Sequence, residues 1–345
     1  MNWNEYGVFI VEETKNLLAI DSPSGMTKKA AEHVMARFEA LGYAPQLTRK
    51  DGVLVSLGGE NQENGLLLEA HMDTLGGMVC QIKANGRLKI TPIGGLRAEN
   101  VETENCRVVT KFDGVIEGTA QLINASTHVN EKYADTQRTF DTIEIVLDEP
   151  VESAEDVKKL GIRTGDYVCF EPRTRVTKSG YIKSRFLDDK LSVGILLGYA
   201  KYLKDEHITP ERAVYVHITS FEEVGHGGSA SVPEGVTEAI SVDMGCVGEG
   251  LTCDERMVSI CAKDSGGPYN YDAVRGLIAA AEKMGAPYAV DVYPRYGSDV
   301  EATLRAGYDI RHGLIGSGVY ASHGYERSHI EGALATLKTL VGYVK

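Results

Sequence analysis

Apolar and polar residues alternate with two different periods along the chain, and each period predicts a different kind of element. Near the amino terminus, apolar residues recur at helical spacing, and they do so again over residues 26–41. The stretches VLVSLGG and GLLLEAHMD that follow are short apolar runs separated by the polar turn ENQENG, which is typical of strands. The opening part of the chain is therefore expected to contain both helices and strands.

Residues 77–171 show a different pattern, made of short strand-like runs such as MVCQIKANGRLKI and TFDTIEIVLD. Asn-Gly, Gly-Gly and Asp-Gly turns separate these runs, and one short helix is expected over residues 153–160. Helix-like and strand-like stretches then alternate again and end in a helix over residues 328–344. The pattern predicts an α/β domain of residues 1–76 and 172–345, interrupted by an inserted all-β domain.

The stretch VYVHITSFEEVGHGG contains a strand-like segment, residues 214–221, that is followed directly by Glu222 and Glu223. Adjacent glutamates most often mark a solvated surface. The segment before them is apolar on both faces, however, as expected for a strand inside a mixed sheet covered by helices. In such sheets, ligand-binding and catalytic groups collect beyond the carboxyl ends of the strands. We therefore expect both glutamates to lie at a functional edge.

Four further stretches place a histidine or an acid directly after an apolar run or before a helix. Each has a simpler explanation when considered alone, such as capping of a helix by Asp188 and Asp189. Together they favour a shared site, because buried acids that converge repel one another unless cations lie between them. The candidates are His71 in LLLEAHMD, Asp188 in RFLDDK, Asp243 in ISVDMG and His323 in YASHGYE.

Imidazole and carboxylate groups form the ligand mixture of hydrolytic zinc sites, and a carboxylate can bridge two ions that lie close together. The charges support two ions, because three carboxylates, two divalent cations and one bridging hydroxide form a neutral cluster that can be buried. Zinc, cobalt and manganese all accept these ligands. The sequence predicts two divalent metal ions per subunit, with zinc as the first expectation.

The order of these motifs resembles the TET-type and glutamyl aminopeptidases of metallopeptidase family forty-two. The motifs are H-x-D, L-D-D before a helix, F-E-E-V-G, V-D-M-G and a carboxy-terminal S-H-G-Y-E, and the resemblance covers nearly the whole chain, including the β insertion. It implies a cytosolic enzyme that removes amino-terminal residues from short peptides, using a water that bridges two metal ions. It also implies that the insertion joins subunits into dimers and then into a dodecamer.

The resemblance assigns a metal ligand to each of five positions. Asp188 would be the carboxylate that bridges the two ions. Glu223 and His323 would complete the coordination of one metal, and His71 and Asp243 that of the other.

The resemblance also assigns two residues that do not bind metal. Glu222 would be the general base, and Asp73 would orient His71 through its ring nitrogen. The chain departs from many relatives at His226 and Gly227, in VGHGGSA, and in the HGYE sequence that contains the last predicted ligand. Both departures lie close to where substrate is expected, so they bear on which substrate is preferred.

Three other functions stay open. A di-metal deacylase or carboxypeptidase of metallopeptidase family twenty shares the α/β core and the glutamate pair, but its inserted domain follows that pair and contains helices. A catalytically silent scaffold is disfavoured because all five ligands and the base are retained. A glycosidase would need two carboxylates without metal dependence, so activity that survives a chelator would favour it.

Composition and charge exclude several kinds of partner. The formal net charge of −13 disfavours nucleic acid, because phosphate backbones repel an acidic surface. No segment is apolar for long enough to cross a membrane. The amino terminus carries acids instead of the basic start of a signal peptide, and the six cysteines contain no C-x-x-C pair. Reduced thiols and a cytoplasmic location are therefore expected.

Overall fold

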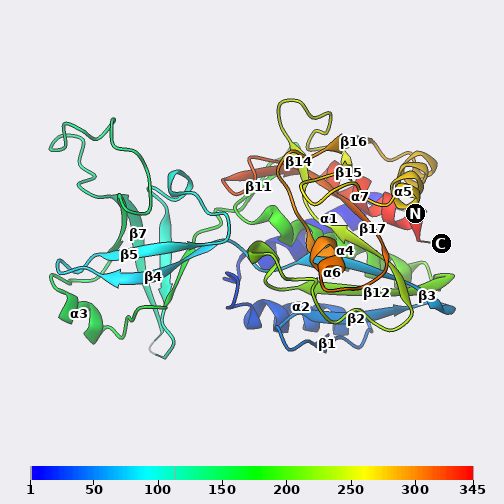
Figure 1. Ribbon diagram of the computed structural model, residues 1–345, viewed down its shortest axis with the longest axis horizontal. Helices are drawn as coiled ribbons and strands as arrows, with labels where there is room; N and C mark the ends of the chain where they lie inside the picture. Colours follow the sequence, from blue (N-terminus) through cyan, green and yellow to red (C-terminus); the bar gives the residue numbers. More distant parts are fainter. Residues whose placement is uncertain (1, 113, 345) are drawn as a thin grey trace. The chain divides into compact units, whose positions relative to one another are not determined.

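The structure is a computed structural model that describes residues 2–112 and 114–344. The chain forms two compact units. One contains the residues up to Thr74 and those from Arg173 onward, and the other is Leu75–Pro172. The first unit combines helices with a large sheet, whereas the second contains a small closed β-barrel (Figure 1). The predicted fold class, a helix-covered mixed sheet with an inserted all-β domain, is confirmed.

The centre of the large sheet consists of parallel strands in the order β12-β3-β13-β17. Their bounds are Arg212–Thr219 for β12, Asn61–His71 for β3, Val236–Val242 for β13 and Arg311–Tyr320 for β17. Because neighbouring strands here run in the same direction, their carboxyl ends meet at one edge of the sheet. Antiparallel strands continue the sheet on both sides.

The remaining strands of this sheet are shorter. They are β1 (Gln46–Leu47), β2 (Val53–Gly58), β10 (Arg175–Val176), β11 (Tyr181–Ser184), β14 (Gly245–Val247), β15 (Val258–Lys263), β16 (Tyr288–Val292) and β18 (Glu326–His329).

Hydrophobic cores cover both faces of the central strands. Leu66 and Leu68 of β3 belong to the larger core, to which several helices contribute, whereas Leu67 belongs to a smaller core that includes Val300 of α6. Alternate residues of a strand point to opposite faces, so a strand between two cores must be apolar at every position. The helices of this unit are α1 (Trp3–Leu18), α2 (Lys28–Ala40), α4 (Leu187–Asp205), α5 (Tyr271–Met284), α6 (Asp299–Arg305) and α7 (Ile330–Tyr343).

Helix α4 is buried along almost its whole length, which explains why it lacks a polar face. Its two glycines lie against α1: a Cβ at Gly194 would clash with Thr14, and one at Gly198 would lie 2.7 Å from Ile10 Cγ1. The second and third residues of the element, Asp188 and Asp189, have non-helical backbone angles, so the regular helix begins after them. Within the described residues, no helix is both long and apolar enough to cross a membrane.

The second unit is an antiparallel barrel that closes in the order β4-β5-β8-β7-β6-β9. Closure leaves no unpaired sheet edge, and alternate residues such as Val79, Ile90 and Ile145 fill the interior. The short predicted helix is present as α3, where the hydroxyl of Ser153 accepts a hydrogen bond from Asp156 N. The elements are β4 (Gly76–Ile82), β5 (Leu88–Ile93), β6 (Asn105–Val109), β7 (Val115–Leu122), β8 (Ile143–Leu147), α3 (Ala154–Lys159) and β9 (Tyr167–Phe170).

Candidate metal centre

The predicted metal ligands lie at the carboxyl edge of the central strands and at the start of α4. His71 is the last residue of β3, and Asp243 follows β13 directly. Glu223 lies in a one-turn 3₁₀ helix after β12, and His323 lies in the loop between β17 and β18. Asp188 approaches the same edge from the first turn of α4. The structure thus brings all five side chains together from five separate segments.

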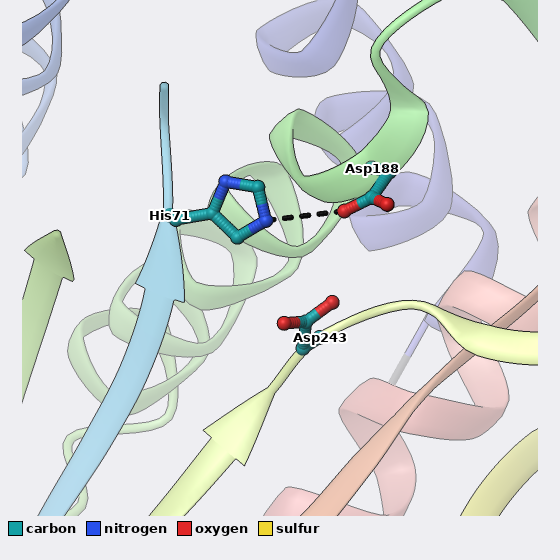
Figure 2. A group of neighbouring side chains, drawn as sticks. All are labelled: His71, Asp188 and Asp243. Atoms are coloured by element: carbon teal, nitrogen blue, oxygen red, sulfur yellow. Dashed lines mark hydrogen bonds and ion pairs between the residues drawn. The ribbon is translucent and has the colours of Figure 1, made fainter. Parts of the chain in front are cut away.

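The five side chains form two groups of potential metal ligands that share Asp188. In the first group, one ligand atom each from His71, Asp188 and Asp243 lie within 4.8 Å of one another (Figure 2). In the second group, ligand atoms of Asp188, Glu223 and His323 meet the same limit. Each group contains one imidazole and two carboxylates, which is a donor set that zinc accepts.

The ring of His71 is held so that one particular nitrogen faces the acids. Its Nδ1 lies 2.9 Å from the main-chain oxygen of Asp73, and its Nε2 lies 3.1 Å from Asp188 Oδ1. Because a carbonyl oxygen only accepts hydrogen bonds, Nδ1 must carry a proton, and Nε2 is the nitrogen available to a metal. The carboxylate of Asp73 lies farther from Nδ1, at 3.6 Å. The closer orienting contact is therefore made by the main chain of Asp73.

The carboxylate of Asp73 instead anchors the turn that carries the two glutamates. Its Oδ1 accepts a hydrogen bond from Glu222 N at 3.1 Å, and its Oδ2 accepts one from Glu223 N at 3.4 Å. The hydroxyl of Ser24 donates to the same carboxylate at 2.5 Å. Asp73 is fully buried, so these bonds replace the water that its charge would otherwise require.

Glu222 and Glu223 point to different partners. Glu222 Oε2 lies 3.7 Å from His71 Nε2, whereas Glu223 Oε2 lies 3.6 Å from His323 Nε2. Their side chains are only 16% and 4% exposed, so the alternative that the two glutamates lie on a solvated surface is wrong. Phe221, just before them, has the left-handed backbone angle φ 72°, which turns the chain sharply at the end of β12.

Burial and mutual repulsion dominate the electrostatics of the site. Burial, together with the charge of the nearby Asp188, raises the pKa of Asp243 to about 7. Burial likewise raises the pKa values of Glu222 and Glu223 well above the ordinary range of a glutamate. These carboxylates therefore lack enough positive charge among the surrounding side chains to ionise together.

The pKa values of the two histidines, His71 and His323, are raised too, which favours their positively charged form. Burial lowers the pKa of His323, but its hydrogen bond to Asp188 and the charge of Glu223 outweigh burial and raise the pKa to about 10. Burial similarly opposes ionisation of Asp188, yet hydrogen bonds from His323 and His71 hold its pKa below the usual range. The site stabilises positive charge between its acids, which is the charge that divalent cations would supply.

Glu326 is a neighbour of the predicted ligands to which the sequence motifs assigned no role. It is 2% exposed, and burial raises its pKa to about 8. Its two carboxylate oxygens accept hydrogen bonds from the main chains of Asp188 and His323. The available signal was its place in the SHGYE motif, three residues after a predicted ligand.

Asp299 at the start of α6 is a second neighbour that the sequence patterns did not identify. Its carboxylate accepts hydrogen bonds from Gly228 N at 2.6 Å and from the hydroxyl of Thr219. These bonds tie the GHGG segment, which follows the two glutamates, to the end of β12. Burial raises the pKa of Asp299 to about 7. Helix α6 has only seven residues, which is too short to show helical periodicity in the sequence.

Comparison with known proteins identifies the family of the chain. The family model of M42 glutamyl aminopeptidases matches residues 51–339. The putative aminopeptidase YhfE of Bacillus subtilis is 41% identical over 335 residues, which cover 97% of this chain and 97% of that protein.

Solved structures share the fold of nearly the whole chain at lower sequence identity. The TET aminopeptidase of a marine sediment Thaumarchaeota archaeon has a TM-score of 0.88 and 17% identity, covering 97% of this chain and 96% of that one. The TET1 peptidase of Pyrococcus horikoshii, which can assemble into a tetrahedron or a large octahedral shell, has a TM-score of 0.84 and 22% identity, covering 97% and 99%. These findings confirm the resemblance visible in the sequence motifs. The chain belongs to the M42 glutamyl aminopeptidase family of peptide-bond hydrolases.

Proposed function

We propose that the protein is a metal-dependent aminopeptidase that hydrolyses the first peptide bond of short peptides, with two divalent metal ions and Glu222 as the general base. The observation that carries this proposal is the pair of three-ligand groups that share Asp188 at the carboxyl edge of the sheet. A single ion would leave one of the two groups of buried acids without a neutralising charge. Two ions joined by a common carboxylate are the arrangement of co-catalytic hydrolases.

The donor atoms support a site for zinc, and cobalt or manganese would also be accepted. Asp188 would bridge the ions, His71 and Asp243 would hold one, and Glu223 and His323 would hold the other. When bound, such ions polarise the carbonyl of the scissile bond and lower the pKa of water. The fixed Nδ1 proton of His71, which leaves Nε2 facing the acids, supports this assignment.

Glu222 is suited to proton transfer because its carboxylate lies 3.7 Å from His71 Nε2 but belongs to neither ligand group. Its carboxylate would accept a proton from the attacking water and return it to the leaving amine. Burial raises its pKa, which makes it a stronger base than an ordinary glutamate. The hydrogen bond from its main-chain nitrogen to Asp73 would keep the base in place during both transfers.

The acidic surroundings also suit the free α-amino group of a peptide, which is a cation that carboxylates can bind. Short peptides are therefore the proposed substrates. The barrel unit would serve assembly into a homo-oligomer, as the assembly described for the Pyrococcus horikoshii relative suggests. The dodecamer and the cytoplasmic location stay predictions.

The proposal is tested by comparing a short peptide with the same peptide acetylated at its amino terminus. We expect release of the first residue from the free peptide and no cleavage of the acetylated one, both measured by mass spectrometry. Equal rates on the two peptides would contradict the aminopeptidase assignment and favour a deacylase or an endopeptidase.

A further inference from the structure

Glu326 connects two of the segments that carry predicted metal ligands. Its Oε2 accepts a hydrogen bond from Asp188 N at 3.0 Å, and its Oε1 accepts one from His323 N at 3.0 Å. The pairing of β11 with β18 places Glu326 opposite Ser184, close to the point where the chain turns toward α4. Asp188 and Glu326 are 138 residues apart in sequence. The side chain of Glu326 therefore joins its own turn to a distant one.

Both turns contain left-handed residues that strain the backbone. His323 itself has φ 63°, Ala321 has φ 60°, and Phe186, two residues before Asp188, has φ 67°. A non-glycine residue in this region persists only when surrounding contacts over-determine the conformation. The two hydrogen bonds to Glu326 are such contacts, because each fixes the main chain of a residue that would bind metal.

We propose that Glu326 is a positioning residue whose carboxylate holds Asp188 and His323 at the separation that metal binding requires. This inference rests on the metal centre of the proposed function. Glu326 would not bind metal itself, because both of its oxygens are directed to main-chain N–H groups. Its effect on metal affinity would pass through the two ligands that it holds.

A second carboxylate in the site, that of Asp73, makes the same kind of contact. Asp73 accepts hydrogen bonds from the main chains of Glu222 and Glu223, just as Glu326 accepts them from Asp188 and His323. Two buried carboxylates thus each hold two site residues by their main-chain N–H groups, which belong to neighbouring residues for Asp73 and to two distant turns for Glu326. The role of Glu326 is the counterpart of that of Asp73, for a different pair of segments.

The substitution Glu326→Gln separates this role from packing, because glutamine has nearly the same shape but only one acceptor oxygen. Its amide NH₂ group would face the N–H of either Asp188 or His323, and two donors repel. Loss of a residue that orients metal ligands typically lowers metal affinity 10–100-fold, which is on the order of the effect expected here. The group of Asp188, Glu223 and His323 should be affected most, since Glu326 holds two of its three members.

Glu238→Gln provides a matched control for the loss of a buried carboxylate. Glu238 is 3% exposed and accepts hydrogen bonds from Tyr343 and Arg311. It lies near the start of β13, at the end opposite to Asp243. Its substitution should lower stability without changing metal affinity.

The experiment measures Zn²⁺ affinity by competition with a chromogenic chelator, using full-length protein first stripped of metal. The visible absorption of bound Co²⁺ reports ligand geometry independently of catalysis, and circular dichroism confirms that each metal-free variant is folded. Glu326→Asp, whose carboxylate is one methylene shorter, is included beside Glu326→Gln. Both should weaken binding and alter the Co²⁺ spectrum, whereas Glu238→Gln should match the parent.

Parental affinity and an unchanged Co²⁺ spectrum in either folded variant of Glu326 would overturn the positioning role. Failure of both variants to fold would overturn it as well, since Glu326 would then be a requirement of the fold. If the parent protein binds no Zn²⁺, the proposed function fails together with the inference. Tight binding by all variants contradicts the inference alone.

Discussion

Glu222 and Glu223 show at the scale of single residues how neighbours in sequence can have different chemistry. The one-turn 3₁₀ helix directs Glu222 toward His71 and Glu223 toward His323. The first glutamate is outside both three-ligand groups, whereas the second belongs to one of them. Substitution of each residue should therefore have a distinct consequence.

We predict that Glu222→Gln keeps both metals and lowers the turnover rate by about 10²–10⁴, because an amide cannot accept the proton. Glu223→Ala should instead bind one of the two metal ions much more weakly, because the substitution removes a ligand from a three-ligand group. Metal content by mass spectrometry after dialysis, measured beside peptide turnover, distinguishes the two. If Glu222→Gln loses metal while Glu223→Ala keeps two ions, the roles are reversed.

His217 gives the fold a predicted sensitivity to acid. It is 1% exposed, its Nδ1 lies 3.6 Å from Glu69 Oε1, and Asp299 and Lys50 are the other charged groups that act on it. Burial lowers its pKa to about 4, against an ordinary value near 6.5. Burial also raises the pKa of Glu69 to about 8, so Glu69 is neutral under acid conditions and cannot compensate a charge on His217.

The unfolded chain protonates His217 more readily than the folded chain does. The stabilising contribution of neutral His217 to the free energy of unfolding is therefore complete above pH 6.5 and is lost as the pH falls toward 4. The loss is on the order of 3 kcal/mol at most. We predict that His217→Asn shows a shallower decline of unfolding free energy across this range in denaturant titrations. The exposed His207, changed to Asn, serves as the control. A decline as steep as that of the parent would show that His217 does not carry the sensitivity.

At the scale of elements, the strands that carry the site could be predicted because burial on both faces leaves a clear sequence pattern. Strands β3, β12 and β13 are apolar runs that end beside an acid or a histidine. The strand order could not be predicted, since the neighbours of β11 and β18 are set by contacts between distant segments. The SHGYE motif places Glu326 near a predicted ligand, but its contact with Asp188 depends on that pairing and could not be predicted.

Helices α5 and α6 were not predicted, for different reasons. Helix α5 has the usual signals, with Asn270 accepting hydrogen bonds from two main-chain N–H groups and Gly285 ending the helix in a left-handed conformation. These signals were present in the sequence and were missed. Helix α6 is short, and its first residue, Asp299, is used to hold the GHGG segment.

The close packing of α6 against the GHGG segment can be tested at Gly228. A Cβ at this position would lie 2.5 Å from the main-chain oxygen of Asp299, so Gly228→Ala must push the two segments apart. We predict a loss of about 1–3 kcal/mol in unfolding free energy and a lower turnover rate, because only Val224 separates the moved segment from Glu223. Gly248→Ala, where a Cβ meets no atom within 4 Å, is the control. Unchanged stability and turnover in Gly228→Ala would contradict the close approach.

At the scale of the whole molecule, the chain consists of two compact units, each with its own buried core. The candidate metal centre is formed entirely by residues of the larger unit. The barrel unit contributes no member of either ligand group among the described residues. Assembly is therefore the role that we propose for the barrel.

We predict that intact protein forms a homo-oligomer and that replacement of residues 78–170 by a short linker abolishes it. Light scattering of both proteins measures the assembly, and circular dichroism checks that the shortened chain is folded. A monomeric intact protein would refute the assembly role, as would a shortened protein that still assembles.

The central claim is that peptide hydrolysis depends on two metal ions at the edge of the sheet. The most direct test is the hydrolysis rate of a chromogenic aminoacyl substrate by chelator-stripped protein during titration with Zn²⁺. We expect no activity without metal and a recovery that saturates near two equivalents per chain. Full activity of the stripped protein would rule out metal dependence, and complete recovery with a single equivalent would rule out a need for two ions.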